Sequence, residues 1–126
     1  MRRIRVTAAV IGDEKRVLLA QRSERMSRPL KWEFPGGKLE EGEGDQESLQ
    51  RELLEELGVE TVVGLYLGEV SHDYEDISID LAVYRVDILR GEPVAKEHRE
   101  LRWVPVAELS GYDLAAADLP VVKLLS

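Results

Sequence analysis

The chain has 126 residues, of which 44% are hydrophobic and 33% are charged, and its formal net charge is −8. This length and composition predict one globular domain spanning residues 1–126. The absence of cysteine excludes disulfides, thiolate zinc sites and thiol nucleophiles, and two histidines are too few for a three-histidine metal site. The acidic balance argues against binding to a nucleic-acid polymer.

No apolar run of signal-peptide length follows the basic residues at the start, and no stretch reaches the roughly 20 apolar residues that cross a bilayer. We therefore expect a cytoplasmic protein with no membrane partner, as a monomer or a small homo-oligomer.

Two strands are predicted at the beginning of the chain, at residues 4–11 and 16–22, because both stretches are rich in β-branched or apolar residues. The turn-forming residues 12–15 between them predict a hairpin. Residues 23–44 are polar and contain two prolines and four glycines, which predicts a long loop. Loops of this length in compact domains are usually functional.

Residues 45–57 carry the clearest helix pattern, because Leu49, Leu53 and Leu57 recur every four positions and form an apolar stripe. Gly58 follows the last turn, where a residue with positive φ commonly ends a helix. The start is less clearly marked: Gly44 or Asp45 is expected to cap it, without the Glu or Gln partner of a full capping box.

The remainder of the chain predicts three strands and then two helical segments, at residues 59–74, 77–89, 101–104, 106–109 and 118–125. The nearly continuous apolar run at residues 81–84 predicts a central strand covered on both faces. Strands interleaved with helices predict an α+β fold, with a mixed β-sheet sandwiched between α-helices.

Three glutamates share one face of the predicted helix. At about 100° per residue, Glu55 and Glu56 lie roughly 60° and 40° to either side of Glu52. Clustered carboxylates at the edge of a core need a counter-ion, and all-oxygen ligand sets select hard cations such as Mg²⁺. The alternative is a solvated acidic face on which Arg51 pairs with Glu47 or Glu55.

The surrounding residues form a longer pattern. Reading from Gly37, the sequence has glycine, five residues, Glu43, seven residues, Arg51-Glu52-Leu53, one residue, Glu55-Glu56, one residue and Gly58-Val59. This string, residues 37–59, resembles the Nudix box at every defined position. Residues 18–22, 32–38 and 117–120 also resemble the MutT-like branch of the Nudix hydrolases, so the likeness covers nearly the whole chain.

The resemblance implies the Nudix fold, an α/β/α arrangement, and a small-molecule substrate. Enzymes of this branch convert a nucleoside triphosphate and water to the monophosphate and pyrophosphate, often removing oxidised nucleotides from the precursor pool. An oxidised dGTP or a cytidine nucleotide is the expected substrate. The alternatives are a sugar nucleotide, a dinucleoside polyphosphate, a capped RNA end, or a nucleotide-binding module without activity.

The resemblance also implies the metal site, in which Mg²⁺, with Mn²⁺ as a substitute, is held by Gly36 through its carbonyl and by Glu52, Glu55, Glu56 and Glu97. Glu100 is the competitor for the place of Glu97. In the family the arginine at the position of Arg51 orients a box glutamate and Glu43 braces the loop. Glu52 is the first choice for the general base, because it lies centrally among the three helix glutamates.

Substrate contacts are expected from Arg22, Glu33, Phe34, Pro35, Lys38 and Asp118, with Arg22 and Lys38 on the phosphates. Asp118 falls where cytidine-active relatives carry an aspartate and the oxidised-guanine specialist carries an asparagine. An ionised carboxylate only accepts hydrogen bonds, so Asp118 favours a base edge that offers donors. The alternatives are that Asp118 caps the last helix and that Phe34 is a core residue. Tyr66, His72 and Tyr74 have even spacing and are expected on one face of their strand.

Overall fold

Two β-sheets form the scaffold of the computed structural model, which describes residues 2–125. The first sheet has the strand order β4-β1-β6-β5, with β1 Arg3–Ile11, β4 Gly36–Lys38, β5 Glu60–Asp73 and β6 Ser78–Arg90. The second has the order β3-β2-β7, with β2 Arg16–Gln21, β3 Trp32–Glu33 and β7 Glu100–Pro105. The helices are α1 Asp45–Leu57, the 3₁₀ helices η1 Val106–Gly111 and η2 Ala116–Asp118, and α2 Val121–Leu124.

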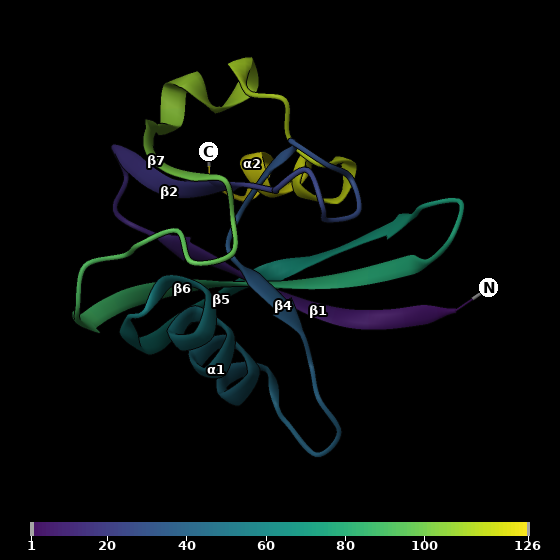
Figure 1. Ribbon diagram of the computed structural model, residues 1–126, viewed down its shortest axis with the longest axis horizontal. Helices are drawn as coiled ribbons and strands as arrows, with labels where there is room; N and C mark the ends of the chain where they lie inside the picture. The colour runs from purple at the N-terminus through teal and green to yellow at the C-terminus, as the bar shows by residue number, and fades with distance from the viewer. Residues whose placement is uncertain (1, 126) are drawn as a thin grey trace.

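The layers confirm the predicted α+β fold with a mixed sheet. Strand β1 runs parallel to β6 and antiparallel to β4. Helix α1 covers one face of this sheet, whereas the second sheet and α2 lie on the other face (Figure 1). The sandwich therefore differs from the expected one, because a second sheet supplies much of one outer layer. Residues 81–83 of β6 are buried, as expected for a central strand.

The predicted hairpin of the first two strands is wrong. Only one bridge, between Gly12 and Val17, joins them at the turn. Beyond it, β1 enters the first sheet and β2 enters the second. The physical reason is that β6 pairs with β1 along its whole length, while on the other edge β4 pairs with residues 6–8 and the Pro35 carbonyl accepts from Ala9, so little of β1 is left for β2.

The predicted loop at residues 23–44 contains two short strands. β3 pairs with β2 and β4 pairs with β1. Gly36 in β4 has φ +155°, and a Cβ there would lie 2.0 Å from the carbonyl oxygen of Thr7. The same glycines that indicated a loop are needed because the β4 backbone passes very close to β1.

Helix α1 is confirmed over residues 45–57. Its leucine stripe is fully buried against β1 and β6, and Gly58 ends it with φ +72°. Gly44 is the N-cap. The expected lack of a capping-box partner is wrong, because the Glu47 side chain accepts a hydrogen bond from the Gly44 N–H at 3.3 Å. What this cap lacks is a side chain at Gly44 itself.

A bulge in β5 separates residues that were expected on one face. Tyr66 pairs with Tyr84 and His72 pairs with Ile79, five positions apart on β6, so these two β5 residues lie on opposite faces of the sheet. The register shift lies between Tyr66 and Gly68, where β5 has one residue more than its partner. Tyr74 follows the strand and, unlike Tyr66, lines the cavity at which the candidate site lies.

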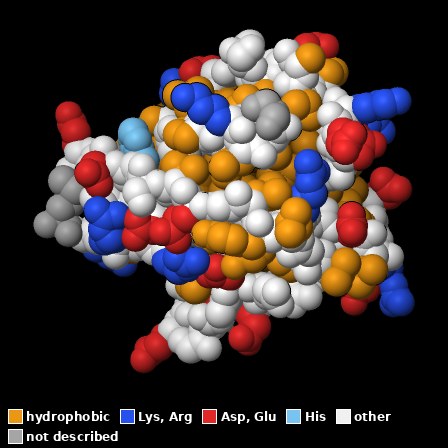
Figure 2. Space-filling model, turned by 180° about the vertical axis from the view of Figure 1, so that it is seen from behind, with side chains coloured by type: hydrophobic (Ala, Val, Ile, Leu, Met, Phe, Trp, Pro, Cys, Tyr) orange, Lys and Arg blue, Asp and Glu red, His pale blue; other side chains and the backbone are white. Residues whose placement is uncertain are grey.

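The predicted last helix, residues 118–125, is replaced by η2 and the four-residue α2. Pro120 is the N-cap of α2, so Asp118 does not cap it. No helix within residues 2–125 is long and apolar enough to span a membrane. On the back of the molecule, hydrophobic side chains gather in a band across the middle of the face, with charged side chains mostly around it (Figure 2).

Candidate active site

A cavity of about 530 Å³ lies between β1, β4, the side of α1 and the loops that precede β3 and β7. It gathers most of the predicted site residues from distant parts of the sequence, namely Arg22, Glu33, Phe34, Gly36, Lys38, Glu52, Glu56, Glu97 and Asp118. Pro35, Arg51 and Glu55 do not line it. Pro35 is buried behind the cavity wall, where its carbonyl accepts a hydrogen bond from the Ala9 N–H at 2.7 Å.

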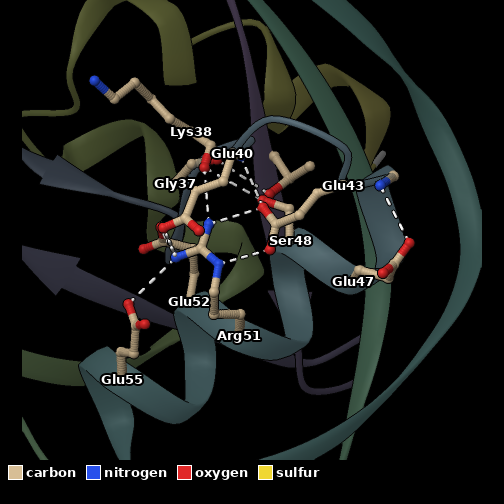
Figure 3. A network of polar contacts seen from close by, with 11 residues as sticks. Gly37, Lys38, Glu40, Glu43, Glu47, Ser48, Arg51, Glu52 and Glu55 are labelled. Carbon is tan, nitrogen blue, oxygen red and sulfur yellow. Dashed lines mark hydrogen bonds and ion pairs between the residues drawn. The ribbon is translucent and has the colours of Figure 1, made fainter.

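Arg51 of α1 joins the helix to the loop before it (Figure 3). Its Nε donates to Glu43 at 2.7 Å, its Nη1 to Glu52 at 2.8 Å, and its Nη2 to the carbonyl of Lys38 at 3.1 Å. The hydrogen bond from Arg51 lowers the pKa of Glu43 to about 2. One guanidinium therefore holds the loop carboxylate and Glu52 at the same time, and these contacts are compatible with the positioning role that stays a prediction for Arg51.

The carboxyl group of Glu52 lies against the backbone of Gly37. A Cβ on Gly37 would be 2.4 Å from Glu52 Cδ, so a side chain at this position would force the Glu52 carboxyl group to move. Burial raises the pKa of Glu52, and the hydrogen bond and charge of Arg51 oppose that rise. The sequence thus folds so that a helix carboxylate and a glycine loop meet at the edge of the cavity.

Glu56 is a partly buried carboxyl group of the site whose pKa is strongly raised. Burial raises its pKa to about 9, and the negative charges of Glu52, Glu33 and Glu97 add to the effect. Its Oε2 atom is buried and has no hydrogen-bond partner within residues 2–125. Buried polar atoms are nearly always paired, so this oxygen indicates a place for a ligand.

These groups fit a divalent cation. Within the described part of the chain, no three His, Asp or Glu side chains already surround a single point closely enough to form a metal site. However, the buried Glu56 oxygen, the Glu52 carboxylate and the charge of Glu97 beside them are an all-oxygen donor set for a hard ion. Gly36, whose carbonyl is the expected backbone ligand, lies in the wall of the same cavity.

Glu55 and Glu100 do not line this cavity. The Glu55 side chain is 58% exposed and lies 3.3 Å from Arg51, so its predicted role as a ligand stays a prediction. Glu100, the competitor of Glu97, pairs with Arg102 at 2.6 Å instead. The structure therefore brings Glu97, and not Glu100, to the helix carboxylates.

His98 is a site residue that the sequence analysis missed. Its side chain is almost fully buried in the cavity wall, and its Nε2 lies 2.7 Å from Glu33 Oε2. The other oxygen of Glu33 accepts from Arg22 at 2.8 Å. No signal in the sequence marked His98, because its charged neighbours at residues 96–100 are typical of a solvated loop.

The two cations predicted to contact phosphates differ in their surroundings. Arg22 donates three hydrogen bonds, one to Glu33, one to the carbonyl of Ser27 at 2.6 Å and one to the hydroxyl of Ser27 at 3.1 Å. The side chain of Lys38 is exposed and points away from the Arg51 network (Figure 3). Of these two cations, Lys38 therefore has the more exposed side chain, whereas Arg22 is held by Glu33 and Ser27.

Asp118 and Phe34 form the buried end of the site. Asp118 Oδ1 accepts a hydrogen bond from the Phe34 N–H at 3.0 Å. Burial, followed by the negative charge of Glu33, raises the pKa of Asp118 well above its ordinary value. This direction favours the protonated form, which both donates and accepts, over the ionised form assumed from the sequence, so the base edge that Asp118 contacts stays a prediction. Phe34 is 3% exposed, packs in the core and also lines the cavity, so its contact with a substrate stays a prediction.

Comparison with known proteins gives consistent matches over the whole chain. A family model described as NUDIX domain matches residues 6–124. The chain is 38% identical to the CTP pyrophosphohydrolase of Escherichia coli over 98% of its own length and 91% of that protein. It is 44% identical to a putative 8-oxo-dGTP diphosphatase 2 of Mycobacterium tuberculosis, over 90% of this chain and 81% of the relative.

Solved structures agree with these relatives. The solution structure of the E. coli ORF135 protein superimposes with a TM-score of 0.86 at 38% identity, covering 98% of this chain and 89% of the other. The crystal structure of a MutT NUDIX hydrolase from Burkholderia pseudomallei superimposes with a TM-score of 0.89 at 25% identity, with both chains fully covered.

Proposed function

The chain belongs to the NUDIX domain family, and from this premise we propose that it hydrolyses a nucleoside triphosphate to the monophosphate and pyrophosphate. Water adds to an internal phosphorus, the bond to the bridging oxygen breaks, and pyrophosphate leaves. The observation that carries the proposal is the meeting of Glu52, Glu56 and Glu97 at one cavity that Asp118 also lines. The names of the two relatives support a nucleotide-pool sanitising role.

The family generally uses divalent metal ions, and we propose Mg²⁺, with Mn²⁺ as a substitute. When bound, Mg²⁺ neutralises phosphate charge and activates water. The residues that would hold it are Glu52, Glu56 and Glu97 with the carbonyl of Gly36. The exposed Glu55 joins them only if its side chain leaves Arg51. The substrate and the protein are both anionic, so binding requires the cation.

Glu52 is proposed as the general base. Arg51 holds its Oε1 atom, so the other oxygen takes the proton of the attacking water. Arg51 is a positioning residue, because its contacts run to carboxylates and to the loop carbonyl of Lys38. The exposed Lys38 side chain binds the phosphates, and Arg22 keeps Glu33 in place beside them.

The base of the nucleotide is proposed to lie at Asp118, with Glu33 and Phe34 beside it. A protonated Asp118 offers both a donor and an acceptor. That is compatible with a cytosine edge and with an oxidised guanine, so both stay in the substrate class. We further propose that the protein works in the cytoplasm as a monomer or small homo-oligomer without a nucleic-acid polymer as partner.

A substrate panel tests this function. We expect turnover of CTP, dCTP, oxidised dCTP, dGTP or 8-oxo-dGTP with Mg²⁺, with pyrophosphate as the product and no orthophosphate. A sugar nucleotide and a dinucleoside polyphosphate serve as comparison substrates. Faster turnover of either comparison substrate would replace the proposed substrate class, and binding of the whole panel without turnover under Mg²⁺ and Mn²⁺ would indicate a non-catalytic module.

A further inference from the structure

A second, more open groove of about 580 Å³ lies beside the active-site cavity. The two hollows share four residues, which are Arg28, Tyr74, Asp76 and Ala115. Because these residues line both the cavity and the groove, they form the wall between the two. We call Arg28, Tyr74 and Asp76 the partition, because their side chains form it.

The partition is built from two segments that are far apart in the sequence. The guanidinium carbon of Arg28 lies 3.7 Å from the centre of the Tyr74 ring, and Arg28 Nη2 donates to Asp76 at 2.7 Å. Stacking and ion pairing therefore join the loop before β3 to the turn between β5 and β6.

Side-chain contacts hold Arg28 against the preference of its own backbone. Its φ is 51°, and that of Leu30 is 63°, which is the left-handed region that non-glycine residues rarely adopt. The Nε atom of Arg28 is buried with no hydrogen-bond partner within residues 2–125. Because the loop is strained in this position, loss of the stack should let it move away and should open the partition.

The partition stands beside the proposed place of the base. The Tyr74 hydroxyl accepts a hydrogen bond at 2.9 Å from the N–H of Ala117, which directly precedes Asp118. Ala115, a shared wall residue, belongs to the same segment and accompanies Asp118 in the cavity lining.

We propose that the Arg28–Tyr74–Asp76 partition sets an upper limit on the size of the base. It closes the cavity beside Asp118, so that nucleotides carrying a bulky group on the exocyclic amine of the base are rejected. Opening it would join the cavity to the second groove and admit such nucleotides. This inference rests on the proposed function, because that function places the base at Asp118.

The test compares two substrates in matched variants. The first is the triphosphate that the unmodified protein hydrolyses best, and the second is the same nucleotide with a benzyl group on its exocyclic amine. In Tyr74→Ala and in Arg28→Ala, the kcat/KM ratio of the benzyl substrate to its parent should rise by about tenfold or more, since removed bulk relieves a steric exclusion of that order.

Two control variants should leave this ratio unchanged. Tyr74→Phe keeps the stacked ring, and Arg25→Ala removes an exposed arginine of the same loop that lines neither hollow. An unchanged ratio in folded Tyr74→Ala and Arg28→Ala proteins would overturn the proposal. An equal loss of kcat/KM for both substrates in Arg28→Ala would also overturn it, because Arg28 would then bind a part of the nucleotide that the two substrates share.

Equilibrium binding separates this inference from the proposed function. Calorimetry with non-hydrolysable analogues of the same two nucleotides should show the same change in the ratio of their Kd values. If the unmodified protein hydrolyses no triphosphate, the proposed function fails, while the Kd ratio still decides whether the partition limits ligand size.

Discussion

Carboxyl groups that contact the same arginine at the site differ in the direction in which their pKa is shifted. Glu43 and Glu52 both face Arg51, but Glu43 has its pKa lowered to about 2 whereas burial raises the pKa of Glu52. Glu43 therefore stays ionised and structural. Glu52 is the proposed base, and its partial burial, its raised pKa and the hydrogen bond that holds one of its oxygens support that proposal.

Replacing this carboxylate tests the assignment. Glu52→Gln should lower kcat by about 10²–10⁴-fold, because the amide cannot take a proton from water. Steady-state kinetics with the best triphosphate measures it, and a thermal melt checks that the variant is folded. Glu41→Gln, an exposed glutamate in the loop before the helix, is the matched control. Retained turnover in Glu52→Gln would assign the base to another residue.

At the scale of elements, the glycine strand β4 determines where α1 and β1 can meet. Gly37 leaves room for the Glu52 carboxyl, and Gly36 lets β4 lie against the Thr7 carbonyl. The β1–β4 pairing and the position of the Glu52 side chain, the proposed general base, therefore depend on two missing Cβ atoms. Without β4, the carboxylates of α1 would have no backbone facing them across the edge of the cavity.

Gly36→Ala should destabilise the protein by about 1–3 kcal/mol, because its Cβ would overlap backbone that cannot move easily. Denaturant unfolding gives the free energy. Gly111→Ala is the control, since a Cβ there meets nothing within 4 Å, and its effect should stay within about 0.5 kcal/mol. Equal effects of the two substitutions would show that the close approach of β4 to β1 is not what requires glycine.

At the scale of the whole molecule, the acidic cavity costs stability when no cation is present. The ordinary pKa of Glu56 is 4.5, and in the folded protein it is raised to about 9. Between these values the folded state binds more protons than the unfolded state, so the free energy of unfolding falls as pH rises. A divalent cation that binds only the folded arrangement offsets this loss.

In a chelating buffer, Tm should therefore fall from pH 6 to pH 9. Millimolar Mg²⁺ should raise Tm at pH 8 by about 3–6 °C, the shift expected for an ion at roughly ten times its Kd. Thermal melts across this pH range, with and without Mg²⁺, measure both effects. Glu56→Gln should remove most of the pH dependence in the chelator. A Tm that rises with pH and ignores Mg²⁺ would contradict the account.

The amino-acid sequence alone determined the parts that local spacing encodes. Leu49, Leu53 and Leu57 predicted α1, Gly58 predicted its end, and residues 81–84 predicted the buried central strand, because each pattern follows from the period of one element. The spacing from Gly37 to Val59 predicted the family for a similar reason. Each of these signals spans 23 residues or fewer and needs no distant partner.

Only the tertiary structure decided which distant segments meet. It separated β2 from β1, turned Gly36–Lys38 into a strand, and placed Tyr66 and His72 on opposite faces through a bulge. It also buried His98 and Asp118 beside Glu33. The physical reason is that strand pairing joins backbone groups, which are the same in every residue, so the choice of partner is settled by how the whole core packs.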